Sequence, residues 1–137
     1  MYTIKQEYED FNGNKRERTF HFNINKAEAI KLEISTTGGI TNKIAKLVEK
    51  QDVPEIGRIL DEIVDLSYGE PSDDGERFIK SKELTEAFKQ TNAYAEIYIK
   101  ILSSEETFAE FLKGILPRDI QKQIDANQLK NQISEIK

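Results

Sequence analysis

The strongest constraint on the fold is an alternation of apolar and polar residues near the N-terminus. The apolar positions that share one face of this pattern are Tyr2, Ile4, Phe20, Phe22 and Ile24. A period of two is typical of a half-buried β-strand. Residues 12–14, Asn-Gly-Asn, separate the two runs, and Asn and Gly accept the positive φ angles of a hairpin turn. The pattern therefore predicts an N-terminal β-hairpin over residues 1–24.

A two-stranded hairpin is only marginally stable in water, so this one must pack on other elements or on another subunit. Helical periodicity supplies such elements over residues 25–117. Apolar residues recur at helical spacing after Pro54, and a proline in the first turn signals a helix start. Asn25 and Ser81 are candidate N-caps, because their side-chain oxygens can accept from the first free backbone N–H groups. Together these signals predict about six helices.

The remaining helix-start and turn signals complete the predicted order of elements. Ser103 and Glu106 have the spacing of a capping box, so we expect a helix to start at Ser103. Residues 68–77 contain several Gly, Pro, Ser and Asp residues and are predicted to form a loop. Residues 118–137 are rich in Gln, Asn and Lys and are predicted to be a polar C-terminal helix or tail. The predicted fold class is α+β, an N-terminal β-hairpin followed by a predominantly helical single domain.

Charge is distributed unevenly along the chain. The net charge is −5, from 20 basic and 25 acidic residues. Residues 52–76 hold nine acidic residues against one arginine, a net charge of −8, and no stripe of Lys and Arg occurs elsewhere. Because phosphate backbones favour clustered basic side chains, we expect no nucleic-acid partner. No apolar run is long enough to cross a bilayer, and the start lacks signal-peptide features, so we expect a cytoplasmic location in whatever cell makes the protein.

Catalytic and metal-binding chemistry finds little support in the residue types present. The chain has no Cys and one His, His21, which alternation places on the solvent face of its strand. Residues 70–81 resemble a calcium loop only superficially, because Ser81 stands where the bidentate Glu is required. No nucleophile can be matched with a base, so we expect no enzymatic activity, no catalytic residues and no metal or other cofactor.

Aromatic residues are concentrated between positions 78 and 111. We expect most of them to be core residues and a minority to line a groove, because proteins that hold partner helices need exposed apolar surface. The candidate partner-binding residues are Phe78, Phe88, Tyr94, Tyr98, Phe108 and Phe111.

Several short runs in the same region resemble the tail assembly chaperones of long-tailed phages and prophages of Gram-positive bacteria. The resemblance covers roughly residues 68–117 and consists of aromatic and turn residues. The matching runs are Tyr68-Gly69-Glu70, Asp74-Gly75, Arg77-Phe78-Ile79-Lys80, Glu86-Ala87-Phe88, Gln90-Thr91, Ala93-Tyr94, Ala109-Glu110-Phe111 and Gly114-Ile115-Leu116-Pro117.

The resemblance implies a non-enzymatic protein that binds the tape measure protein and keeps it soluble during tail-tube assembly. It also implies contact with the tail tube protein, a longer form of the chain made by ribosomal frameshifting, and absence from the mature virion. The hairpin edge could join another subunit's strand, which would give a homo-oligomer. The alternatives are a structural head–tail connector or minor tail protein, and then a small regulatory binding protein. Tail assembly chaperone is the functional prediction.

Overall fold

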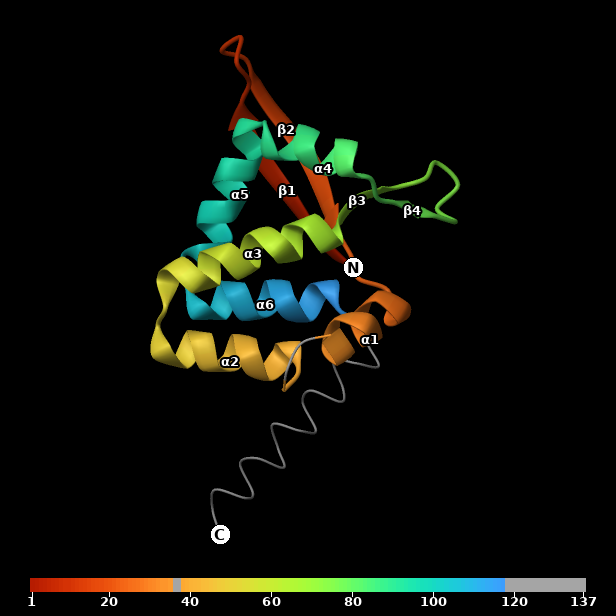
Figure 1. Cartoon of the computed structure of the whole chain (residues 1–137). Helices are drawn as coiled ribbons and strands as arrows, with labels where there is room; N and C mark the ends of the chain where they lie inside the picture. The colour runs from red at the N-terminus through yellow and green to blue at the C-terminus, as the bar shows by residue number, and fades with distance from the viewer. Residues whose placement is uncertain (36–37, 118–137) are drawn as a thin grey trace.

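The computed structural model describes residues 1–35 and 38–117, so the helix or tail predicted for residues 118–137 lies outside the described residues. Ten elements follow one another in these ranges (Figure 1), and they confirm a hairpin followed by a mostly helical region. They are β1 (Tyr2–Glu9), β2 (Lys15–Phe22), α1 (Lys26–Ser35), α2 (Ile40–Lys50), α3 (Val53–Ser67), β3 (Tyr68–Pro71), β4 (Phe78–Ile79), α4 (Lys82–Lys89), α5 (Asn92–Leu102) and α6 (Glu105–Ile115).

The predicted hairpin is part of a larger antiparallel sheet. Strands β1 and β2 pair over their full length, with Ile4 opposite Phe20, and Gly13 in the connecting turn has a φ of +83°. The loop predicted for residues 68–77 is wrong in its first part, because Tyr68–Pro71 forms β3. Strand β3 pairs with β2 on one side and β4 on the other, which gives the strand order β1-β2-β3-β4.

Polar side chains cap the N-terminal ends of most of the described helices. Asn25 and Glu28 bond reciprocally at the start of α1, and Asp52 caps α3 just before Pro54. Ser81 accepts from the backbone N–H of Leu84 and caps α4 as predicted. One predicted cap is wrong by a residue. In the structure Ser104 caps α6, whereas the hydroxyl of Ser103 donates to the last turn of α5.

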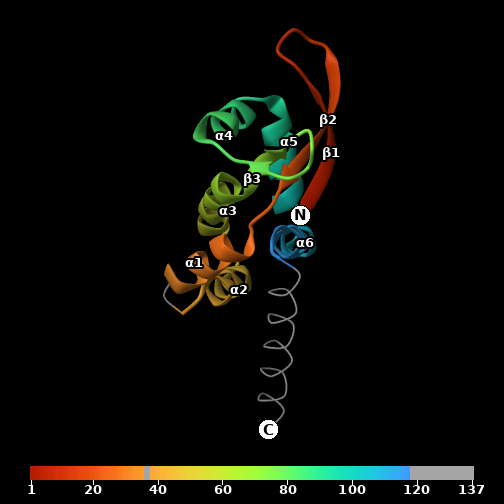
Figure 2. The ribbon, with the colours of Figure 1, turned by 90° about the vertical axis from the view of Figure 1, so that its right-hand side faces the viewer.

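The core lies between one face of the sheet and the helices. Figure 2 shows the described helices gathered on one side of the β1–β2 hairpin. Buried side chains from both strands meet buried side chains from α3, α4, α5 and α6. The end of β2 is also tied to the helices by its backbone, since Asn23 donates to the Ser67 carbonyl and Ile24 to the Ile115 carbonyl, both at 2.8 Å. The hairpin is therefore stabilised by packing, as its length alone requires.

Candidate partner-binding surface

The predicted aromatic residues divide into a buried and a half-buried group. Phe88, Phe108 and Phe111 are at most 4% exposed and belong to the core. Tyr94 and Tyr98 are partly buried and pack against that core, and Phe78 is partly buried elsewhere. Most of the set thus contributes to the core, and its partner-binding role stays a prediction.

Phe88 is at the centre of the aromatic core. Its ring stacks on Tyr68 with centroids 4.3 Å apart and an interplanar angle of 12°, and it lies 5.2 Å from the ring of Phe20. Phe111 on α6 meets Phe22 edge to face at 5.4 Å. Aromatic pairs with such geometries add to the stabilisation from burial itself. These buried rings connect the sheet to α4 and α6, and in this structure they offer no surface to a partner.

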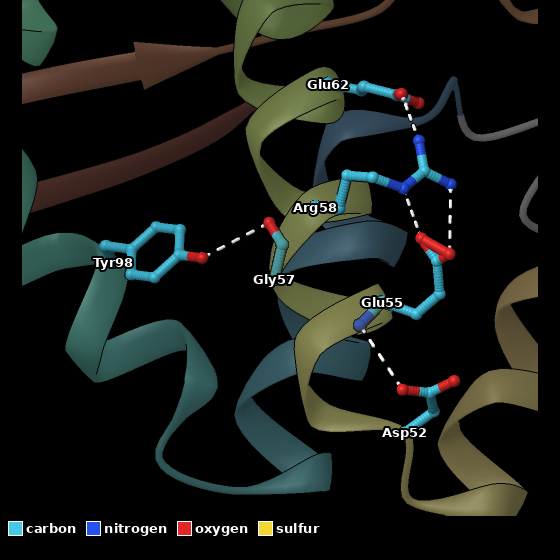
Figure 3. Close-up of polar contacts among 6 residues, drawn as sticks. All are labelled: Asp52, Glu55, Gly57, Arg58, Glu62 and Tyr98. Carbon is cyan, nitrogen blue, oxygen red and sulfur yellow. Dashed lines mark hydrogen bonds and ion pairs between the residues drawn. The ribbon is translucent and has the colours of Figure 1, made fainter.

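Tyr94 and Tyr98 use their hydroxyl groups to hold α5 against α3. The Tyr94 hydroxyl donates to a carboxylate oxygen of Asp61. The Tyr98 hydroxyl donates to the Gly57 carbonyl at 3.2 Å (Figure 3). Burial raises the pKa of Tyr94 above its ordinary value, and the hydrogen bond to Asp61 and its charge raise that pKa further. Both phenols are thus held neutral and oriented, and both residues keep part of their surface exposed.

Phe78 lies on β4, at the end of the sheet, outside the buried core cluster. It is paired with Pro71 across β3 and β4, and its ring covers Gly69 so closely that a Cβ on Gly69 would lie 2.7 Å from the ring. The ammonium group of Lys80 lies 5.9 Å from the ring centroid, within the range of a cation–π interaction. Phe78 is therefore a fixed, partly exposed aromatic side chain at the β3–β4 end of the sheet.

An apolar groove lies where the N-terminal ends of α3 and α6 meet the C-terminal end of α5. It has a volume of about 310 Å³. Its lining residues are Gln51, Val53, Ile56, Leu102, Ser104, Glu105 and Phe108. Of the six predicted aromatic residues, Phe108 alone reaches this groove. The other apolar lining residues have the sequence pattern of ordinary helical core positions, and no sequence signal sets them apart.

Five of the nine acidic residues of the segment 52–76 cap or lie on α3, and the other four lie in β3 and the turn that follows it. Asp52 caps the helix, and Arg58 lies between Glu55 and Glu62 and bonds to both (Figure 3). Such exposed pairs contribute little to stability because water screens them. The helix thus presents excess negative charge to solvent on one side and its apolar residues to the core on the other.

The structure shows the surroundings of His21 and of the loop around Asp74, the two features considered for metal or catalytic chemistry. His21 is half-buried, which corrects the expectation of a solvent-facing side chain: β3 pairs beside it at Gly69, and its Nδ1 is buried without a hydrogen-bond partner among the described residues. Asp74 accepts from the Ser72 hydroxyl and the Glu76 N–H, and these bonds lower its pKa. Within residues 1–35 and 38–117, no group of three or more His, Asp or Glu residues could hold a metal ion.

No helix in the described part of the chain combines the length and the apolar character needed to cross a membrane. In a comparison with known families, a family model described as phage tail assembly chaperone matches residues 1–136. No curated protein and no solved structure gives a significant match. The family match spans the sheet, the described helices and the aromatic region, so it concerns the whole chain and not one motif.

Proposed function

Because the chain belongs to the phage tail assembly chaperone family, we propose that it binds the tape measure protein of its own phage and keeps that protein soluble while the tail tube assembles. The observation that carries this proposal is the family match over residues 1–136. The aromatic and turn residues that carry the resemblance lie within the matched range. The proposal places the protein in the host cytoplasm during assembly, with the tail tube protein and a frameshifted longer form of the chain as further partners.

The physical demands of this task fit the surface of the molecule. An elongated, apolar-striped helical protein aggregates unless its apolar stripe is covered. A holder for it needs apolar contact area and a well-solvated exterior, because repulsion between like charges keeps a complex dispersed. The half-buried aromatic residues provide apolar contact area. The −8 charge of residues 52–76 provides a well-solvated exterior.

Contact with the partner is proposed for the aromatic residues that keep exposed surface, Phe78, Tyr94 and Tyr98. Aromatic side chains bring large contact area at low entropic cost, and they are enriched among residues that dominate binding energy. The buried members, Phe88, Phe108 and Phe111, would act indirectly by fixing α4, α5 and α6.

The test is co-expression of this chain with the tape measure protein from the same phage genome. The expected result is that the tape measure protein is insoluble alone and soluble in a complex that copurifies. A tape measure protein that stays insoluble in the pair, or needs no help, would contradict the proposal.

The surface assignment has its own variant. Phe78→Ser removes a partly exposed ring, and capture should fall strongly while the variant stays folded by circular dichroism. Ile34→Ser is the matched control, because Ile34 is also an apolar residue, 80% exposed, but lies on α1 outside the aromatic region. Equal capture by Phe78→Ser, Ile34→Ser and the wild type would remove Phe78 from the binding surface and leave the chaperone proposal standing.

A further inference from the structure

The solvent-facing side of α5 is apolar. Only two of the eleven residues of this helix are charged. Its core-facing residues, which recur at intervals of four, are Ala93, Ile97 and Ile101. Ala95 and Ile99 lie on the opposite side and are exposed, Ile99 to 65%. A helix that is apolar on all sides is normally covered on all sides. The described part of the chain therefore leaves one face of α5 without the cover that its composition predicts.

This exposed face continues into the groove between α3, α5 and α6. Tyr98 and Leu102 lie between the core-facing and the exposed sides of α5, and both are half-buried. The Tyr98 hydroxyl reaches the Gly57 carbonyl on α3 (Figure 3). Leu102 lines the groove together with Ile56, the residue before Gly57. We call Ala95, Tyr98, Ile99 and Leu102 together with the groove the α5 surface. It extends over about two turns of helix.

Acidic residues surround the α5 surface. Nine acidic and three basic residues lie on α3 with its cap, on α5 and on α6, so these helices have a net charge of −6. The acidic residues are Asp52, Glu55, Asp61, Glu62, Asp65, Glu96, Glu105, Glu106 and Glu110, and the basic residues are Arg58, Lys100 and Lys113. The elements that pack most closely against these helices, β1, α2 and α4, have net charges of −1, +2 and 0 and leave the region strongly acidic.

An apolar surface with an acidic border fits one kind of partner. An amphipathic helix with apolar residues at positions i, i+3, i+4 and i+7 can lay them along α5 and into the groove, whose volume is about 310 Å³. Lys and Arg beside that apolar stripe are attracted by the border, whereas Asp and Glu are repelled by it. Apolar contact then supplies affinity, and charge selects among apolar helices.

We propose that the α5 surface binds a helix of the tape measure protein whose apolar stripe is flanked by Lys and Arg. This inference rests on the proposed function and adds to it the surface used and the charge of the recognised segment. It gives Phe108 a direct role, because its side chain lines the groove. Phe78 lies on β4 and not on the α5 surface, so the two surfaces can be tested separately.

Copurification of the full chain with the coexpressed tape measure protein tests the apolar part of the surface. Ile99→Lys places a charge on the exposed face of α5, and Lys is a good helix former, so the helix should persist. Capture should fall about tenfold or more, as for a disrupted central contact of an interface. Ile34→Lys is the matched control, since Ile34 is an exposed isoleucine on α1, and it should capture like the wild type. Circular dichroism checks that both variants are folded.

A second pair of variants tests the charge. Glu105→Lys reverses a charge in the lining of the groove, whereas Glu76→Lys makes the same change in the turn between β3 and β4. Glu105→Lys should weaken capture, and Glu76→Lys should not. Overlapping peptides of the tape measure protein, assayed for binding to the full chain by fluorescence anisotropy, should bind where apolar residues at helical spacing are flanked by Lys and Arg. Added salt should weaken that binding.

The outcomes separate this inference from the proposed function. A wild type that captures no tape measure protein overturns both. If the wild type captures it, full capture by Ile99→Lys or by Glu105→Lys overturns the assignment to the α5 surface and leaves the proposed function standing. Binding peptides with a net negative charge would equally overturn the inference alone.

Discussion

Gly69 shows how closely the last strands approach one another. A Cβ at this position would lie 2.6 Å from the Ile79 carbonyl oxygen and 2.7 Å from the Phe78 ring. The first of these neighbours is backbone in a paired strand, so it cannot move without disturbing β4. In the sequence Gly69 has the features of a loop residue, because glycine is frequent in turns and the strand it belongs to is too short to display a period.

We expect Gly69→Ala to lower the free energy of unfolding by about 1–3 kcal/mol, the usual cost of overpacking a buried site. Urea unfolding followed by circular dichroism measures this loss. Gly57→Ala is the comparison, because a Cβ there meets only the hydroxyl end of the Tyr98 side chain, at 2.7 Å. An alanine inside α3 also gains helix propensity, which offsets part of its cost. Equal losses for the two variants would contradict the role given to the β4 backbone.

Tyr94 links stability to alkaline pH. Burial and the bond to Asp61 raise its pKa above the ordinary value of 10.0, so the folded state favours the neutral phenol. A raised folded pKa means that this contribution is fully present below pH 10 and is lost as the pH rises toward the folded value. The free energy of unfolding should therefore be lower above pH 10 than below it.

Tyr94→Phe removes the hydroxyl and keeps the ring. We expect a loss of about 1 kcal/mol at neutral pH, the net value of a typical hydrogen bond. The variant should also show a weaker decline in stability at alkaline pH than the wild type. Ultraviolet absorbance of the phenolate gives an independent check, since one tyrosine fewer should resist ionisation in the folded variant. An unchanged alkaline decline would place the pH dependence in other groups.

Elements with a full period or a strong start signal could be predicted from the sequence. The β1–β2 hairpin was predictable because its alternation and its Asn-Gly-Asn turn agree, and α3 was predictable because Asp52 and Pro54 mark its start. Strands β3 and β4 were missed because pairs of this length contain too few residues to alternate. The predicted start of α6 was displaced by one residue because Ser103 and Ser104 can both cap a helix, and in the structure Ser104 does so.

The hairpin and the helices should unfold together because their side chains interlock. Phe22 on β2 is fully buried and contacts the rings of Tyr68, Phe88 and Phe111. Phe22→Ala should cost about 3–5 kcal/mol, through lost burial and the cavity that remains. Guanidinium unfolding measures the loss.

Phe11→Ala is the matched control within the same hairpin, because Phe11 is 80% exposed. Its effect on the free energy of unfolding should stay within about 0.5 kcal/mol, as for other surface substitutions. Similar losses in the free energy of unfolding for Phe11→Ala and Phe22→Ala would contradict the conclusion that the buried face of the hairpin stabilises it.

At the scale of the whole molecule, the candidate surface was only partly predictable. Sequence periodicity identifies an aromatic residue as apolar, but exposure depends on which elements cover it after folding. Phe88 and Phe111 are covered by the sheet, whereas Phe78 lies at the β3–β4 end of the sheet and keeps part of its surface exposed. The groove escaped prediction for the same reason, since Val53 and Leu102 come together only when α3 and α5 meet near the start of α6.

The proposed assembly role predicts where the molecule is found once a tail is complete. Tail-tube subunits that polymerise around the tape measure protein would occupy the surface that the chaperone covered, so the chaperone should leave as the tube grows. Mass spectrometry of purified virions should detect the tail tube protein and the tape measure protein but not this chain. The infected-cell lysate is the control, because the chain must be detectable there by the same method. Its presence in virions in a fixed ratio to the tail tube protein would contradict a chaperone role and favour the head–tail connector or minor tail protein.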